Sequence, residues 1–154
     1  MANTQQMIEQ ETKDFNTTKK IMKRIFQKYK KKFEMEQNPI YSPIDSWMRV
    51  GQKQYNVEIK ERQQDMEKYQ TLPLKVKKYC NIIENTDQTT TPLIIYLLNN
   101  SEYYIFNLNK IDLNKVELKN WNIAKVQYCE NQTFEFQPTF FLPLNMAVYN
   151  GKIE

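Results

Sequence analysis

The first half of the chain contains an aspartate, a glutamate and a lysine whose side chains and spacing could support catalysis. Glu58 comes thirteen residues after Asp45, and Lys60 lies two residues beyond Glu58. Apolar and polar residues alternate over 55–60, which predicts a half-buried strand with Glu58 and Lys60 on one face, about 6–7 Å apart. Two carboxylates beside an ammonium group can bind a divalent cation and hold a water next to it.

This stretch resembles the motif of the PD-(D/E)xK nuclease superfamily. Pro43-Ile44-Asp45 matches its first half and Glu58-Ile59-Lys60 its second, although one residue separates the proline from the acid. The spacing is similar to that of archaeal-type Holliday junction resolvases, and the pattern of elements extends over roughly residues 1–112. The resemblance implies an α/β, restriction-endonuclease-like fold: a mixed four- to five-stranded sheet flanked by helices, with a long N-terminal helix.

The same resemblance implies roles for individual residues in a metal-dependent DNA endonuclease. Asp45, Glu58 and the carbonyl of Ile59 would hold Mg²⁺, for which Mn²⁺ is expected to substitute. Lys60 would position or deprotonate the attacking water. Glu11 is the candidate for an extra acid from the first helix, because it falls on the apolar stripe of that helix; alternatively, it is a solvated acid at a frayed helix start.

The absence of histidine narrows the chemistry that the chain can perform. With no histidine, Ser-His-Asp and Cys-His catalysis and histidine-ligated zinc are excluded. The chain has only two glycines, which is too few for a dinucleotide-binding fingerprint, and their spacing does not fit a P-loop. Any catalysis must use carboxylates, lysine, tyrosine or cysteine.

The elements that would position these residues follow from hydrophobic periodicity, and one domain over 1–154 is expected. Apolar residues at helical spacing predict a helix over 4–34, and alternation predicts a strand over 44–50 that turns at Gly51-Gln52. A second helix is predicted over 73–85, with Val76, Tyr79, Cys80 and Ile83 on its inner face. A buried strand is predicted over 91–98 and an antiparallel one over 102–108. Residues 112–130 fit neither period, and the aromatic segment 133–149 is expected to wrap the core or pair two subunits.

Lysines gather on both predicted helices. A net charge of +4 mildly favours a polyanionic partner such as DNA. Each group is either a phosphate-binding surface or a solvated helix face. The lysines that we predict to contact DNA are Lys23, Lys28, Lys30 and Lys31 near the first helix, and Lys75 and Lys78 near the second.

Several features bear on where such a protein works. No apolar run approaches the length of a membrane span, the first residues are polar and acidic, and Cys80 and Cys129 show no disulfide or metal pattern. A cytoplasmic protein is therefore expected. Richness in Asn, Lys, Ile and Tyr is typical of an AT-rich genome, such as that of a phage or a low-GC bacterium.

Two other functional classes are compatible with the same sequence. A catalytically silent protein of the nuclease fold could serve as a DNA-binding or virion component, and a small interaction module could dock its aromatic C-terminal segment on a partner. The combination of Asp45, Glu58 and Lys60 favours the enzyme. A homodimer would suit an enzyme that cuts two strands.

Overall fold

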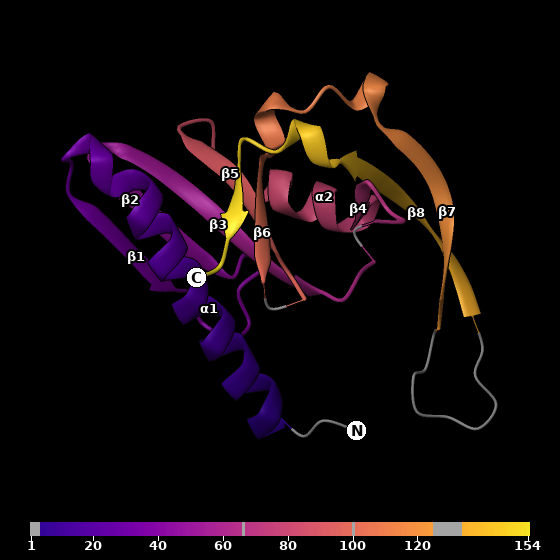
Figure 1. Ribbon diagram of the computed structural model, residues 1–154, viewed down its shortest axis with the longest axis horizontal. Helices are drawn as coiled ribbons and strands as arrows, with labels where there is room; N and C mark the ends of the chain where they lie inside the picture. The colour runs from indigo at the N-terminus through magenta and orange to yellow at the C-terminus, as the bar shows by residue number, and fades with distance from the viewer. Residues whose placement is uncertain (1–3, 66, 100, 125–133) are drawn as a thin grey trace.

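A mixed sheet with a long helix on one face and a short helix and a second sheet on the other forms the protein (Figure 1). The structure, a computed structural model, describes residues 4–65, 67–99, 101–124 and 134–154. The expected α/β class, with a long N-terminal helix and a mixed sheet, is confirmed. The main sheet has six strands, more than the four or five expected.

The main sheet runs in the order β1-β2-β3-β5-β6-β9. Its strands are β1 (Phe33–Gln37), β2 (Ser46–Val50), β3 (Lys53–Arg62), β5 (Thr90–Leu98), β6 (Glu102–Asn107) and β9 (Tyr149–Lys152). Only the central pair, β3 and β5, is parallel; the other pairs in this sheet are antiparallel. The hairpin between β2 and β3 turns at Gly51, whose φ of +63° is a left-handed conformation that glycine adopts without steric cost.

Strand β5 shows how the sheet separates two cores. Leu93, Ile95 and Leu97 pack with α1 (Thr4–Phe26), whereas Ile94 and Tyr96 face the opposite core. The alternation follows from the strand period of two, which sends successive side chains to opposite faces. The continuous apolar run over 91–98 is therefore a strand buried on both sides, as the sequence predicts.

The second core lies between the main sheet, α2 (Val76–Glu84) and a three-stranded antiparallel sheet. That sheet has the order β4-β8-β7, with β4 (Thr71–Lys75), β8 (Phe134–Pro143) and β7 (Glu117–Ala124). The aromatic C-terminal segment thus contributes to the core through β8. Short 3-10 turns, η1 (Gln27–Tyr29), η2 (Leu108–Lys110), η3 (Leu113–Lys115) and η4 (Leu144–Met146), complete the described elements.

Two sequence-based helix boundaries and one predicted burial are wrong. The first helix ends at Phe26 rather than at residue 34, because Lys30 is left-handed with a φ of 53° and Phe33 begins β1. The second helix starts at Val76, since residues 71–75 pair with β8 as strand β4. Cys80 is exposed rather than on the inner face of that helix, where Ile82 is buried instead.

Two other expectations concern Cys129 and the absence of a membrane span. Cys129 and the rest of 125–133 lie outside the described residues. Within the described part of the chain, no helix combines the length and apolar character needed to cross a membrane.

Candidate active site

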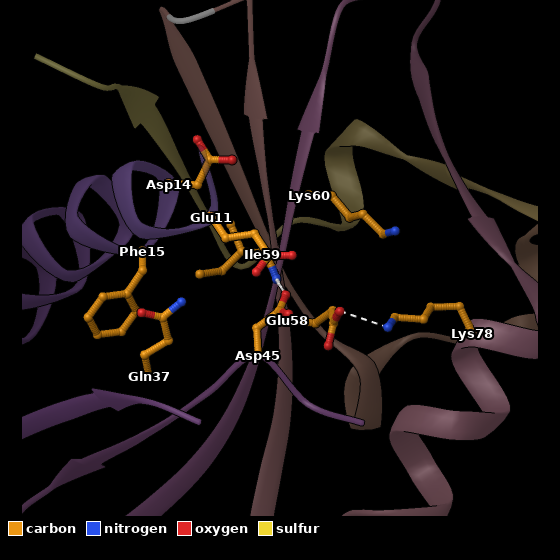
Figure 2. A pocket seen from close by; sticks show the side chains of 9 residues that line it. All are labelled: Glu11, Asp14, Phe15, Gln37, Asp45, Glu58, Ile59, Lys60 and Lys78. Atoms are coloured by element: carbon orange, nitrogen blue, oxygen red, sulfur yellow. Dashed lines mark hydrogen bonds and ion pairs between the residues drawn. The ribbon is translucent and has the colours of Figure 1, made fainter. Parts of the chain in front are cut away.

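A cavity of about 280 Å³ opens where the N-terminal half of α1, the β2–β3 hairpin and α2 approach one another (Figure 2). The three motif residues, Asp45, Glu58 and Lys60, all line it. The remaining lining residues are Glu11, Asp14, Phe15, Gln37, Ile59 and Lys78. Side chains from five separate segments thus meet in one place.

The hairpin register brings the two carboxylates of the motif together. Ser46 of β2 pairs with Val57 of β3, so Asp45, the residue before the strand, lies across from Glu58. The Ile59 N–H donates to Asp45 Oδ2 at 2.8 Å, and the Asn38 N–H donates to the Asp45 carbonyl oxygen at 2.9 Å. Since the N–H and C=O of a strand residue point to the same edge, we infer that the Ile59 carbonyl also faces the Asp45 side of β3.

Glu58 is a buried carboxylate with only one of its oxygens satisfied. The residue is 3 % exposed, and its Oε1 forms an ion pair of 2.8 Å with Lys78 Nζ. Its Oε2 is buried and has no hydrogen-bond partner among the residues that the structure describes. Burial, and then the charge of Asp45, raise the pKa of Glu58 to about 7 despite the opposing effect of Lys78.

Such an environment suits a bound cation. A buried carboxylate oxygen without a partner is costly, and a cation beside Asp45 and Glu58 would supply the missing interaction and offset their mutual repulsion. In the described ranges no three or more histidine, cysteine, aspartate and glutamate side chains cluster as metal ligands. The predicted donor set differs from such a cluster, because it consists of two carboxylates and the Ile59 carbonyl, and these groups fit the oxygen preference of Mg²⁺.

Lys60 lies on the rim of the cavity, two residues after Glu58 on β3. Part of its side chain is open to solvent. Partial burial, and then the neighbouring charge of Lys78, lower the pKa of Lys60, while Glu58 and Asp45 oppose that shift. Figure 2 shows the Lys60 and Lys78 ammonium groups on the same side of Glu58.

A second hollow of about 660 Å³ adjoins the cavity along α2 and shares Lys60 and Lys78 with it. Lys75 and Lys77 also line this hollow, which we call the lysine groove. Its other lining residues are Cys80, Asn81, Glu84 and Gln137. The predicted DNA-contacting residues Lys75 and Lys78 therefore lie next to the motif residues.

Helix α1 contributes two acids to the cavity, of which the sequence indicated one. Glu11 lines the cavity but is exposed, whereas Asp14 is half-buried. Burial raises the pKa of Asp14, with Glu61 adding to the effect, and Gln10 Nε2 donates to Asp14 Oδ1 at 2.9 Å and to Glu61 Oε2 at 3.0 Å. The available signal was the spacing of three residues from Glu11, which puts both acids on one helix face. No comparable signal pointed to Gln37.

The basic residues near the end of α1 lie away from the cavity. Neither Lys23, Lys28, Lys30 nor Lys31 lines it, and Lys23 is about 18 Å along the helix from Glu11. Lys31 lines a different hollow, with Tyr29, Tyr55 and Tyr149 among its neighbours. Contact between these lysines and DNA stays a prediction.

Comparison with known proteins yields likenesses to solved structures only. No protein-family model matches the chain, and no curated protein matches it by sequence. A similar solved structure is that of Hjc, a Holliday junction resolvase from the archaeal hyperthermophile Archaeoglobus fulgidus, at 1.6 Å resolution. The TM-score is 0.47 at 12 % identity, over 81 % of this chain and 88 % of that one. Similarity at this level supports no transfer of function from one protein to the other.

Proposed function

We propose that the protein is a metal-dependent endonuclease that hydrolyses phosphodiester bonds of branched or duplex DNA. The observation that supports this function best is the convergence of Asp45, Glu58 and Lys60 on one cavity. One Glu58 oxygen is buried there without a hydrogen bond from the described part of the chain. A structural ion pair on a surface strand would not require a second carboxylate opposite Glu58. The adjoining lysine groove supplies positive charge where a phosphate backbone would approach.

In this proposal Asp45, Glu58 and the Ile59 carbonyl hold Mg²⁺, or Mn²⁺ in its place. When bound, the cation would supply charge neutralisation at the phosphate and a lower pKa for a bound water. The Ile59 N–H keeps the Asp45 carboxylate in position through its hydrogen bond of 2.8 Å. Ile59 would thus serve the metal site twice: its N–H orients the Asp45 carboxylate, and its carbonyl would be a ligand itself.

Lys60 is the group that we assign to the attacking water. Its ammonium group can donate a hydrogen bond to a water and to a phosphate oxygen at the same time. Because partial burial and Lys78 lower its pKa, it gives up a proton more readily than a free lysine does. Lys75 and Lys78 would bind phosphates on either side of the scissile bond.

A nuclease assay with Mg²⁺ on four-way junctions, flaps, duplexes and single strands tests this function. Glu58→Ala removes a ligand and is expected to abolish cleavage in a protein whose circular dichroism spectrum is unchanged. Glu117→Ala is the matched control, because Glu117 is an exposed glutamate on β7 that pairs with Lys119, away from the cavity. Full cleavage by pure, folded Glu58→Ala would contradict the assignment.

The ion pair between Lys78 and Glu58 favours a second candidate, a catalytically silent protein of the same fold. At 2.8 Å, Lys78 already neutralises Glu58 and would stabilise the strand without any cation. Such a protein would serve as a DNA-binding, virion or protein-interaction component. Titration with Ca²⁺ or Mn²⁺ by calorimetry separates the two, since only the enzyme requires stoichiometric binding that Asp45→Asn removes.

The proposed setting of the enzyme is the cytoplasm of a cell or of a phage-infected host, where Mg²⁺ and DNA are both available. A two-fold dimer would present two such cavities to two strands. Sedimentation equilibrium with and without junction DNA measures that state directly.

A further inference from the structure

The loop between β1 and β2 presents two apolar side chains to solvent. Tyr41 is 96 % exposed and Ile40 is 56 % exposed. Single exposed apolar residues are common on protein surfaces, but an adjacent aromatic and aliphatic pair at the tip of a loop forms a local apolar surface. Neither side chain belongs to either hydrophobic core.

Hydrogen bonds hold the loop in one conformation. The Ser42 N–H donates to the Pro39 carbonyl at 2.8 Å, which closes a turn with Ile40 and Tyr41 at its two central positions. At the base of the loop, Asn38 Nδ2 donates to the Ile44 carbonyl at 3.0 Å, and the Ile44 side chain is buried in the second core. The apolar pair is therefore held outward by a braced turn, which lowers the entropy that a contact would cost.

The loop starts and ends at the wall of the candidate active site. Gln37, just before it, and Asp45, at its end, both line the cavity. Tyr41 is four residues from each, so its Cα is within about 14 Å of both. Nucleotides in one strand of duplex DNA follow one another about every 3.4 Å along the helix axis, so a reach of about 14 Å corresponds to about four nucleotides.

We propose that Tyr41, supported by Ile40, stacks on an unpaired base of the DNA strand whose phosphate enters the cavity. This inference rests on the proposed nuclease function and specifies its substrate class: DNA with an unstacked base within about four nucleotides of the scissile bond. In perfect duplex DNA every base face is covered by its neighbours, so the tyrosine ring has no partner there. At a branch point, a flap or a single-stranded end the base face is free, and stacking removes both apolar surfaces from water.

The lysine groove and the turn would then divide the recognition between them. Lys75, Lys77 and Lys78 contact phosphates in any DNA, which gives affinity without distinguishing paired from unpaired regions. Tyr41 contributes only where a base is free, which gives preference for branched or single-stranded sites. Stacking does not depend on base identity, so little sequence preference is expected from this contact.

The test compares two DNA ligands that differ by one unpaired base. Affinity is measured by fluorescence anisotropy in Ca²⁺, which is expected to support binding without turnover, for a perfect duplex and for the same duplex with a single-nucleotide flap. The unmodified protein is expected to prefer the flap by roughly tenfold, the lower part of the range for base–aromatic stacking. Tyr41→Ala should reduce that preference to about one, while Tyr41→Trp retains it.

Tyr69→Ala is the matched control. Tyr69 is also an exposed tyrosine, at 49 %, but it lines a hollow that shares no lining residue with the candidate active site. Its removal is expected to leave the flap preference unchanged. A 2-aminopurine base in the flap should also show a fluorescence change on binding that Tyr41→Ala, but not Tyr69→Ala, removes.

Several outcomes would overturn the inference. Equal loss of affinity for both DNAs in Tyr41→Ala, or an unchanged preference, would show that Tyr41 does not read unpaired bases. A dimer that dissociates on Tyr41→Ala, with DNA preference retained, would assign the apolar pair to contact between two copies. If the unmodified protein cleaves DNA without preferring the flap, the inference alone fails. If it neither binds nor cleaves DNA, the proposed function fails with it.

Discussion

Glu58 has an environment unlike that of a surface glutamate, and its protonation should therefore affect stability. Its pKa is raised from 4.5 to about 7, chiefly by burial. The folded state then binds the proton more tightly than the unfolded state between these values. The contribution of Glu58 to the free energy of unfolding is therefore fully present below about pH 4.5, and it is lost as the pH rises through about 7.

The first prediction concerns the variant Glu58→Gln, which keeps the shape of the side chain but cannot ionise. Both proteins are measured with a chelator present. Between pH 5 and pH 8, the free energy of unfolding of the unmodified protein should decrease, and this decrease should exceed that of the variant by up to ~3 kcal/mol. Urea denaturation at several pH values measures this difference. Asp14, whose pKa is also raised, remains in both proteins and so cancels. Parallel pH profiles would show that Glu58 ionises normally.

Lys60 allows chemistry to be separated from DNA binding. If its ammonium group acts at the attacking water, its contribution appears mainly in the transition state. We predict that Lys60→Met and Lys60→Ala both reduce turnover by about 10²–10⁴ in single-turnover assays. Affinity for DNA in Ca²⁺ should change little, because several lysines share that role. Loss of affinity in proportion to cleavage would instead make Lys60 a phosphate anchor.

At the scale of the elements, lysines form two separate groups. Those of β4 and α2 lie in the lysine groove beside the cavity, whereas Lys23 lies in the last turn of α1 and Lys28 in η1. A duplex of six base pairs spans only about 20 Å, so it can reach the first group without reaching the second.

We therefore predict that the first group contributes to the binding of short and long DNA, whereas the second contributes only to the binding of long DNA. The double change Lys75→Ala and Lys77→Ala should lower the log–log salt slope of binding by about 1.8 for both short and long DNA. The matched pair Lys23→Ala and Lys28→Ala should lower it only for a duplex of about 30 base pairs. Unchanged slopes for the second pair on long DNA would leave the end of α1 a solvated surface.

At the scale of the whole molecule, one hydrogen bond links the two sheets across the second core. The hydroxyl of Tyr96 on β5 donates to the carbonyl of Pro73 on β4 at 2.9 Å, and Tyr96 is fully buried. Burial raises the pKa of this hydroxyl far above its ordinary range, so it remains a donor at all accessible pH values.

The corresponding prediction is that Tyr96→Phe destabilises the protein by about 1–3 kcal/mol, because the Pro73 carbonyl is left buried without its donor. Urea denaturation measures this change. The folding transition should stay single, since both sheets share the core. Tyr104→Phe is the control, because Tyr104 lies on neighbouring β6 but is only partly buried. Equal effects of the two changes would contradict a specific link through Tyr96.

The sequence alone determined the elements whose hydrophobic periodicity is strong. Alternation over 55–60 predicted β3, and with it the shared face of Glu58 and Lys60; Gly51 predicted the turn that brings Asp45 opposite Glu58. The apolar run over 91–98 predicted the central strand. In these segments the side-chain pattern within a few residues is sufficient, because burial on one or both faces decides both strand and register.

Only the tertiary structure decided the rest of the site. The helical stripe continued past Phe26 in the sequence, yet Phe33 pairs with Val50 in a strand; likewise Pro73 belongs to β4 because it pairs with Phe141 of β8. The ion pair of Lys78 with Glu58 joins residues on different elements, and Asp14 enters the cavity through the way α1 packs on the sheet. The physical reason is that pairing and packing between distant segments override weak local preferences, and no local pattern records which distant segments will meet.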